Sequence, residues 1–138
     1  MTIVGFNFIK ISAEKLAPVT GKVNINNNIM LSDVKEIDVN LGSKDNKGLR
    51  VEFNYICDYE PKIGKISLNG EVLIVEDQAK INDSLAQWKK NKTLDKELTH
   101  QVMTHILNKS TIQALIMSKD ILLPAPIPLP KIQTNKKE

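Results

Sequence analysis

The sequence predicts an α+β fold in which a four-stranded antiparallel sheet is followed by a short and a long helix. Over residues 48–60, apolar residues alternate with polar ones, and this period of two is that of a strand with one buried face. After Asp77 the apolar residues recur every three or four positions, as in amphipathic helices. The two kinds of segment do not alternate along the chain, which favours an antiparallel sheet over a βαβ arrangement.

The first extended segment is IVGFNFIKIS, near the start of the chain. Strict alternation divides its apolar residues between two faces, with Val4, Phe6 and Phe8 on one and Ile3, Ile9 and Ile11 on the other. A sheet covered on one side cannot bury both sets. We therefore expect part of this strand to lie in a subunit contact, to bind another molecule, or to pack under a loop of its own subunit.

The second extended segment covers residues 22–41 and is separated from the first by Pro18 and Gly21. The loop GSKDNKG follows it. The third segment is GLRVEFNYICDYE, at 48–60. Its expected buried face consists of Leu49, Val51, Phe53, Tyr55, Cys57 and Tyr59.

A hairpin joins the third segment to the fourth. Pro61 and Gly64 mark the turn, and KISLNGEVLIVED returns as the fourth strand. Gly70 lies in the middle of this strand and indicates a bulge or a bend.

Two helices are expected after the strands. The short one carries Ile81, Leu85 and Trp88 at helical spacing. The long one is expected to begin with Thr93 as its N-cap and to end near Ser118. Its apolar stripe is expected to comprise Leu98, Val102, Ile106, Ile112 and Ile116.

The chain then continues as ILLPAPIPLPKI, residues 121–132. Prolines at every second position from 124 to 130 exclude a helix or a central strand. The segment is nevertheless apolar, with Leu122, Leu123, Ile127 and Leu129. We expect it to be a strap that packs on its own domain or on a neighbouring subunit, the alternative being a ligand for an aromatic-lined groove. The chain is thus divided into an α+β domain at 1–120 and a strap with a basic tail at 121–138.

Composition restricts the class of protein. A chain of 138 residues is long enough to form one domain without disulfides or metals, and its single cysteine, Cys57, suits a reducing compartment. The first residues, MTIVGFNFIKIS, show neither a basic region before an apolar run nor a small-residue cleavage site, and no apolar run is long enough to span a membrane, so we expect a soluble, cytoplasmic protein. The net charge of +3 arises from 19 basic and 16 acidic residues that are largely interleaved, which argues against a nucleic-acid partner.

Candidates for catalysis are few. His100 and His105 are five residues apart, about 140° around a helix, so they are not spaced as a metal-binding pair. Asp58 and Glu60 share a strand face and are either paired carboxylates or, as we favour, solvated charges. The sequence contains no HExxH, CxxC, P-loop, GxGxxG or GxSxG motif. We expect neither an enzyme nor a cofactor.

Aromatic residues raise one further possibility. Phe53 and Tyr55 on one strand have Arg50 and Lys62 nearby, as in sheet-based RNA-binding domains. The glycine and basic residues of an RNP motif are missing around them. A core position under the long helix is the interpretation we favour.

Three stretches of the chain together resemble one known family. They are FNFIKISAEKLAP, in which a long first strand runs into a proline, the pair VEFNYICDYEP and GKISLNGEVL, and HQVMTHILNKSTIQALIMSKDILLPAPIPL. This order is similar to that of the SecB family of export chaperones, particularly the SecB-like proteins of archaea. ILLPAPIPL stands where SecB has its leucine-rich proline segment after the long helix. The resemblance covers most of the chain and consists of an arrangement without a diagnostic motif.

The resemblance implies a homo-oligomer, a dimer or a tetramer built as a dimer of dimers, that holds unfolded polypeptides without ATP or metal. It implies a role in protein export or in preventing aggregation, with neither nucleic-acid binding nor membrane insertion. In that family the first strand and the long helix build subunit contacts, and apolar grooves take extended clients. The matching residues here, which would form a peptide-binding or assembly surface, are Phe6, Phe8, Ile9, Ile11, Leu122, Leu123, Ile127 and Leu129.

Two other functions stay open at this point. A non-enzymatic interaction subunit would bury the same apolar surface against one dedicated folded partner. A small enzyme whose site is not visible in the sequence is the third hypothesis.

Overall fold

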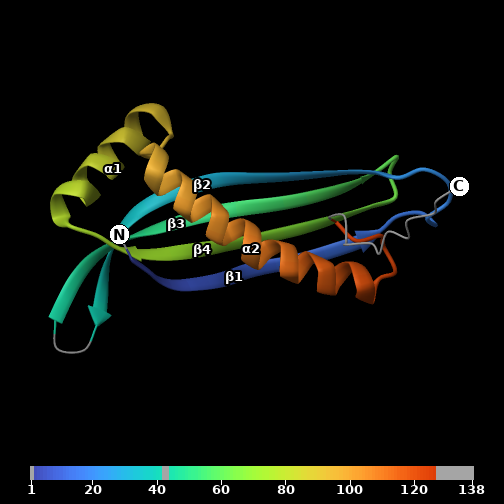
Figure 1. The fold of residues 1–138 in the computed structure, drawn as a ribbon, viewed down its shortest axis with the longest axis horizontal. Helices are drawn as coiled ribbons and strands as arrows, with labels where there is room; N and C mark the ends of the chain where they lie inside the picture. The colour runs from blue at the N-terminus through green and yellow to red at the C-terminus, as the bar shows by residue number, and fades with distance from the viewer. Residues whose placement is uncertain (1, 42–43, 127–138) are drawn as a thin grey trace, which may run out of the picture.

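The computed structural model describes residues 2–41 and 44–126, and in this part of the chain four strands precede two helices. The elements are β1 (Thr2–Lys15), β2 (Asn24–Leu41), β3 (Lys44–Glu60), β4 (Gly64–Val75), α1 (Gln78–Asn91) and α2 (Lys96–Asp120). The strands form one antiparallel sheet in the order β1-β4-β3-β2 (Figure 1). The predicted fold class and order of elements are confirmed.

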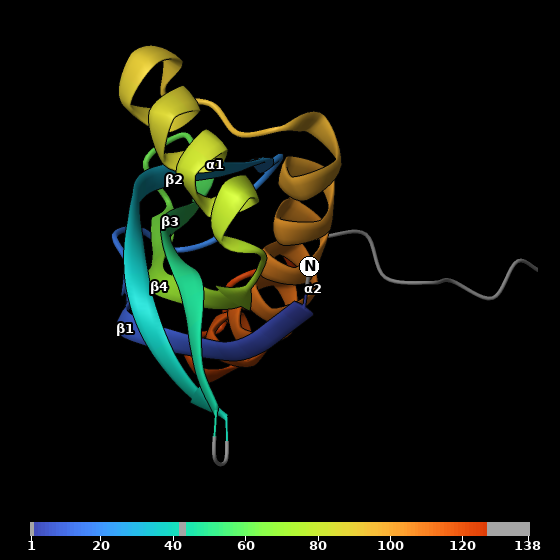
Figure 2. The same cartoon turned by 90° about the vertical axis from the view of Figure 1, so that its left-hand side faces the viewer.

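Both helices lie on the same face of the sheet, where α1 packs on β2 and β3 and α2 crosses β4 and β3 (Figures 1 and 2). Uninterrupted alternation along β3 directs one set of side chains to this face. The residues of that set, each at most 1% exposed, are Leu49, Val51, Phe53, Tyr55, Cys57 and Tyr59. The buried face predicted for the third strand is therefore correct, and it forms the centre of the core.

Two irregularities in β1 change the faces that its residues occupy. The register with β4 shifts after Ile3 and again after Phe8, which leaves Val4 and Ile9 as extra residues. Each extra residue reverses the alternation. The residues that pair with buried positions of β4 are consequently Ile3, Phe6, Phe8, Ile11 and Ala13. The expectation that Ile3 and Ile11 lie on the face opposite the phenylalanines is wrong.

Strand β4 itself pairs regularly with β3. The irregularity expected at Gly70 is located in the partner strand, because Gly70 pairs with Phe8 and the extra residue Ile9 follows Phe8 directly. Pro61 and Gly64 flank the turn between β3 and β4, as predicted.

Strands β2 and β3 continue beyond the other two. β4 pairs with β3 only as far as Gly48, which lies opposite Val75, whereas β2 and β3 stay paired out to Leu41 and Lys44. Figure 2 shows this two-stranded extension projecting away from the body of the sheet. The segment expected as the loop GSKDNKG therefore belongs to β3 from residue 44 onward.

Helix α2 follows the predicted stripe at Leu98, Val102 and Ile106 and departs from it after Ile106. Its sheet-facing residues are Val102, Ile106, Ser110, Ala114 and Ser118. Ile112 and Ile116 are 59% and 51% exposed. The reason is geometric, because the six residues from Ile106 to Ile112 correspond to about 240° around the axis. The N-cap is Asp95, two residues after the expected Thr93.

Candidate functional site

An aromatic cluster attaches β1 to the core. The Phe6 ring stacks on Phe53 at 5.4 Å between centroids and meets Phe8 edge-on at 5.0 Å. On the other side, Phe6 lies 5.4 Å from the ring of His105 on α2. Phe6 and Phe8 are half-buried. Both therefore contribute to packing within the subunit, and each leaves part of its ring accessible.

Two isoleucines of β1, Ile9 and Ile11, are more exposed to solvent than the phenylalanines. Ile9 and Ile11 are 64% and 47% exposed, and Leu16, just after the strand, is 63% exposed. Within the described residues β1 ends the sheet, because its pairing is with β4. Such an edge presents unpaired backbone groups next to the exposed apolar side chains, and edges of this kind readily pair with another chain.

A second apolar surface lies on the outer side of α2. Ile112 and Ile116 are 59% and 51% exposed, whereas neighbouring Ala114 is fully buried. Leu107 is 46% exposed but lies about 140° around the helix from Ile112. Ile112 and Ile116 are one turn apart and form a continuous patch. Exposed apolar residues grouped on one helix typically mark an interaction site.

The chain leaves α2 through a tight backbone turn. Leu123 N–H donates to the carbonyl of Ser118 at 2.8 Å, and Leu122 N–H donates to that of Lys119 at 3.3 Å. These two bonds form a Schellman motif, in which Leu122 takes the left-handed conformation with φ 58°. Leu122 is consequently 76% exposed, whereas Leu123 is 7% exposed and packs in the core. Ile127 and Leu129 lie outside the described residues.

Residues 122–126 then run along the ends of the strands. The hydroxyl of Tyr59 donates to the carbonyl of Pro124 at 2.7 Å, and the amide Nδ2 of Asn27 donates to that of Pro126 at 2.8 Å. The hydroxyl of Tyr55 donates to Asn27 Oδ1 at 2.8 Å. The first part of the proline segment is thus fixed to β2 and β3.

This polar network was not predicted from the sequence. The feature of the sequence that indicates such a network is the presence of two tyrosines on an otherwise apolar strand face, because a buried hydroxyl requires a hydrogen-bond partner. Burial raises the pKa of both Tyr55 and Tyr59 well above the ordinary value.

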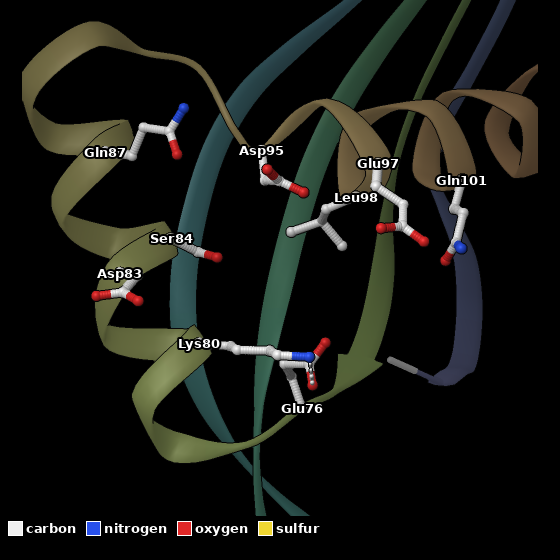
Figure 3. Close-up of a pocket in the computed structure, with 9 residues that line it drawn as sticks. All are labelled: Glu76, Lys80, Asp83, Ser84, Gln87, Asp95, Glu97, Leu98 and Gln101. Atoms are coloured by element: carbon white, nitrogen blue, oxygen red, sulfur yellow. Dashed lines mark ion pairs between the residues drawn. The ribbon is translucent and has the colours of Figure 1, made fainter.

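A polar pocket of about 540 Å³ opens between α1 and α2 (Figure 3). Four carboxylates line it, from Glu76, Asp83, Asp95 and Glu97. Lys80 is the basic residue of the lining, and its Nζ lies 3.9 Å from Glu76 Oε1. The pocket is therefore acidic, and it is separate from the residues proposed from the sequence.

A second cavity, of about 550 Å³, lies between the start of β1 and α2. His100 and His105 both line it, together with polar side chains of Thr2, Thr104 and Asn108. The two histidines thus share a cavity although they lie about 140° apart on the helix. Burial, with a contribution from nearby Lys109, lowers the pKa of His105.

The opposite face of the sheet is mainly polar. Arg50 Nε lies 3.8 Å from Glu52 and 3.6 Å from Glu71. Asp58 shares this face and pairs in register with Lys65. The two ion pairs of Arg50 are partly buried, because the side chains of Arg50, Glu52 and Glu71 are 34%, 31% and 18% exposed.

Cys57 is fully buried, and burial raises the pKa of its thiol to about 11. No three His, Cys, Asp or Glu side chains within 2–41 and 44–126 are grouped so that they could bind a metal ion. None of the helices in these ranges has the length and apolar character needed to cross a membrane.

Comparison with known proteins gives one informative result. No family model matches the sequence, and no curated protein matches it significantly. The structure is similar to that of a SecB-like chaperone of Mycobacterium tuberculosis, solved in complex with a ChAD peptide from the HigA1 antitoxin. The similarity covers 98% of this chain and 92% of the other, with a TM-score of 0.57 and 6% sequence identity. The fold is therefore SecB-like, as the resemblance implied.

Proposed function

We propose that this protein is a non-enzymatic, ATP-independent chaperone that binds extended segments of unfolded polypeptides. The observation that carries the proposal is the SecB-like fold over nearly the whole chain, combined with apolar residues left exposed on β1 and α2. A single subunit that only had to be stable in water would gain by burying them. Their exposure favours a surface that another polypeptide covers.

The proposed surface has two parts. Phe6, Phe8, Ile9 and Ile11 offer partly exposed aromatic and aliphatic groups beside the free edge of the sheet. An extended client can add to such an edge as a further strand, so main-chain hydrogen bonds would supply affinity that does not depend on sequence. The second part is the strap, where Leu122 and Leu123 are continued by Ile127 and Leu129, and which we propose as a wall of the same surface.

We further propose that the chain acts in the cytoplasm as a homo-oligomer, a dimer or a tetramer. The exposed patch of Ile112 and Ile116 supports this, because helix faces of this kind associate readily. Either protein export or general protection against aggregation would use the same binding activity.

One alternative has a specific observation in its favour. The similar mycobacterial chaperone was solved with a peptide of one antitoxin. A chain that serves one dedicated partner would need the same apolar surfaces and would differ in selectivity. Stoichiometric copurification of one protein, without binding to unrelated unfolded chains, would favour this alternative.

The test is the aggregation of two unrelated, chemically unfolded clients diluted into buffer with increasing amounts of this protein, without nucleotide. Light scattering should fall to a plateau at a defined ratio for both clients. The double variant Ile9→Ser, Ile11→Ser should weaken the effect, whereas Lys10→Ser, on the same strand, should not. Unchanged scattering at a large excess of wild-type protein would refute the chaperone function.

A further inference from the structure

Residues 122–126 are attached to the sheet through their main chain. Three alternate carbonyls accept hydrogen bonds, each from a different strand. In chain order the bonds are Lys15 Nζ to Leu122 O at 3.4 Å, Tyr59 Oη to Pro124 O at 2.7 Å, and Asn27 Nδ2 to Pro126 O at 2.8 Å. Leu122 belongs to the turn, with φ 58°, and Pro124 and Pro126 follow it. Alternate carbonyls of an extended chain point to one side, so the spacing of the Pro124 and Pro126 carbonyls is that of an extended peptide lying on a surface. The donors therefore recognise backbone that any extended polypeptide carries.

One apolar side chain anchors the segment. Leu123 packs among Tyr59, Ile63 and Ile66, and it is 7% exposed. Gly64 makes room for it, because a Cβ at position 64 would lie 3.1 Å from Leu123 Cδ1. The surface thus combines an apolar socket with donors for the carbonyls that follow it.

The donor groups are held in place independently of the segment. Tyr55 donates to the side-chain oxygen of Asn27, which leaves the amide Nδ2 directed at Pro126. Tyr59 is the penultimate residue of β3, is paired with Ile25 on β2 and Gly64 on β4, and is 1% exposed. Prolines at 124 and 126 bring no N–H that would lack an acceptor in this position.

We propose that Tyr59, Asn27 and the socket at Gly64 form a binding site for an extended segment in which an apolar residue precedes proline. In this protein residues 122–126 occupy the site in cis, and a client segment of the same chemistry displaces them. This inference rests on the proposed chaperone function. It adds that residues 122–126 compete with client segments for the same site.

Competition has a quantitative consequence. A tethered segment acts at an effective concentration on the order of millimolar, so a free peptide must exceed this or bind more tightly to displace it. The apparent affinity for a free peptide equals the intrinsic affinity multiplied by the fraction of molecules whose site is not occupied by the tethered segment. Weakening the tethered segment should therefore strengthen binding of a free one.

The experiment uses the full-length chain and a fluorescent peptide with the sequence of residues 119–127. Leu123→Ala removes the anchor from the tethered segment and leaves the socket intact. We expect it to bind the peptide at least about tenfold more tightly than wild type, since the loss of a buried leucine weakens packing by at least that factor. Adding Tyr59→Phe to Leu123→Ala should reverse most of the gain, and a peptide with Ala at the position of Leu123 should bind weakly to both.

A second measurement does not depend on the stability of Leu123→Ala. In wild-type protein, millimolar unlabelled peptide should shift the NMR signal of the Ala125 amide to that of a free chain. Binding of the peptide without movement of Ala125, or no binding at all, would overturn the inference. If suppression of aggregation persists in that case, the chaperone function stands and the internal competitor does not. A fall in native mass for Leu123→Ala without tighter peptide binding would assign the segment to assembly and would equally overturn it.

Discussion

Gly70 on β4 lies directly against the ring of Phe53 on β3. A Cβ built at position 70 would be 2.7 Å from Phe53 Cζ and 2.4 Å from the carbonyl oxygen of Asn7 on β1. Both distances are shorter than any ordinary van der Waals contact. The absence of a side chain at this one position therefore allows three strands and the aromatic cluster to pack together.

The first prediction follows from this contact. Gly70→Ala should lower the free energy of unfolding by about 1–3 kcal/mol, because the methyl group must displace either the ring or the edge strand. Hydrogen exchange should accelerate most in β1, since the carbonyl of Asn7 is the shortest contact. Ser67→Ala, on the solvent-facing side of β4, is the control and should change stability by less than about 0.5 kcal/mol. Equal stability of Gly70→Ala and wild type would show that the strands adjust freely.

Two adjacent leucines should respond in opposite ways. Leu122 is exposed with a positive φ, so Leu122→Gly should be neutral or should stabilise the protein by up to about 1 kcal/mol. Leu123 is buried, and Leu123→Ala should destabilise by about 2–4 kcal/mol. Urea denaturation of both variants tests this pair. A large loss of stability in Leu122→Gly would mean that the Leu122 side chain makes a contact beyond its own subunit.

Stability should fall as the pH drops below about 6.5, because of His105. Its pKa is lowered in the folded protein, so the unfolded chain binds the proton first and protonation favours unfolding. The effect starts near the ordinary value of 6.5 and levels off below the lowered value. Thermal unfolding between pH 5 and 7 should show this slope in wild type, and His105→Gln should flatten it. His100→Gln is the matched control in the same cavity; an equal flattening there would contradict the assignment to His105.

Cys57 should be inert in the folded protein. Its thiol is fully buried with a pKa raised to about 11, so at pH 8 only about one molecule in a thousand carries the reactive thiolate. A thiol reagent should modify it only after addition of denaturant, whereas a cysteine introduced at exposed Lys10 should react at once. Rapid modification of Cys57 under native conditions would indicate that β3 opens locally.

The sequence allowed correct prediction of those parts of the fold that depend on local pattern. The buried face of β3 was predicted because six residues alternate without interruption. The faces of β1 were not, because Val4 and Ile9 are extra residues only with respect to the pairing with β4. Such bulges depend on the partner strand and leave no periodic signal in the sequence.

A similar reason applies to α2 and to the strap. Small and polar residues, such as Ser110 and Ser118, face the sheet because the helix crosses it closely, and a search for apolar spacing passes over them. The bond from Tyr59 to Pro124 joins residues 65 positions apart. The apolar character of the strap was visible in the sequence, but the donors that hold its carbonyls became apparent only from the structure.

The last prediction concerns the outer face of α2. Ile112→Glu with Ile116→Glu places two charges on side chains that are 59% and 51% exposed, so a lone subunit should lose little stability. If this face joins subunits as we propose, burying these charges would cost several kcal/mol, and the native mass measured by light scattering should fall. Asn91→Glu, at the exposed end of α1, should leave the mass unchanged. An unchanged mass for the double variant would exclude this face from the subunit contact.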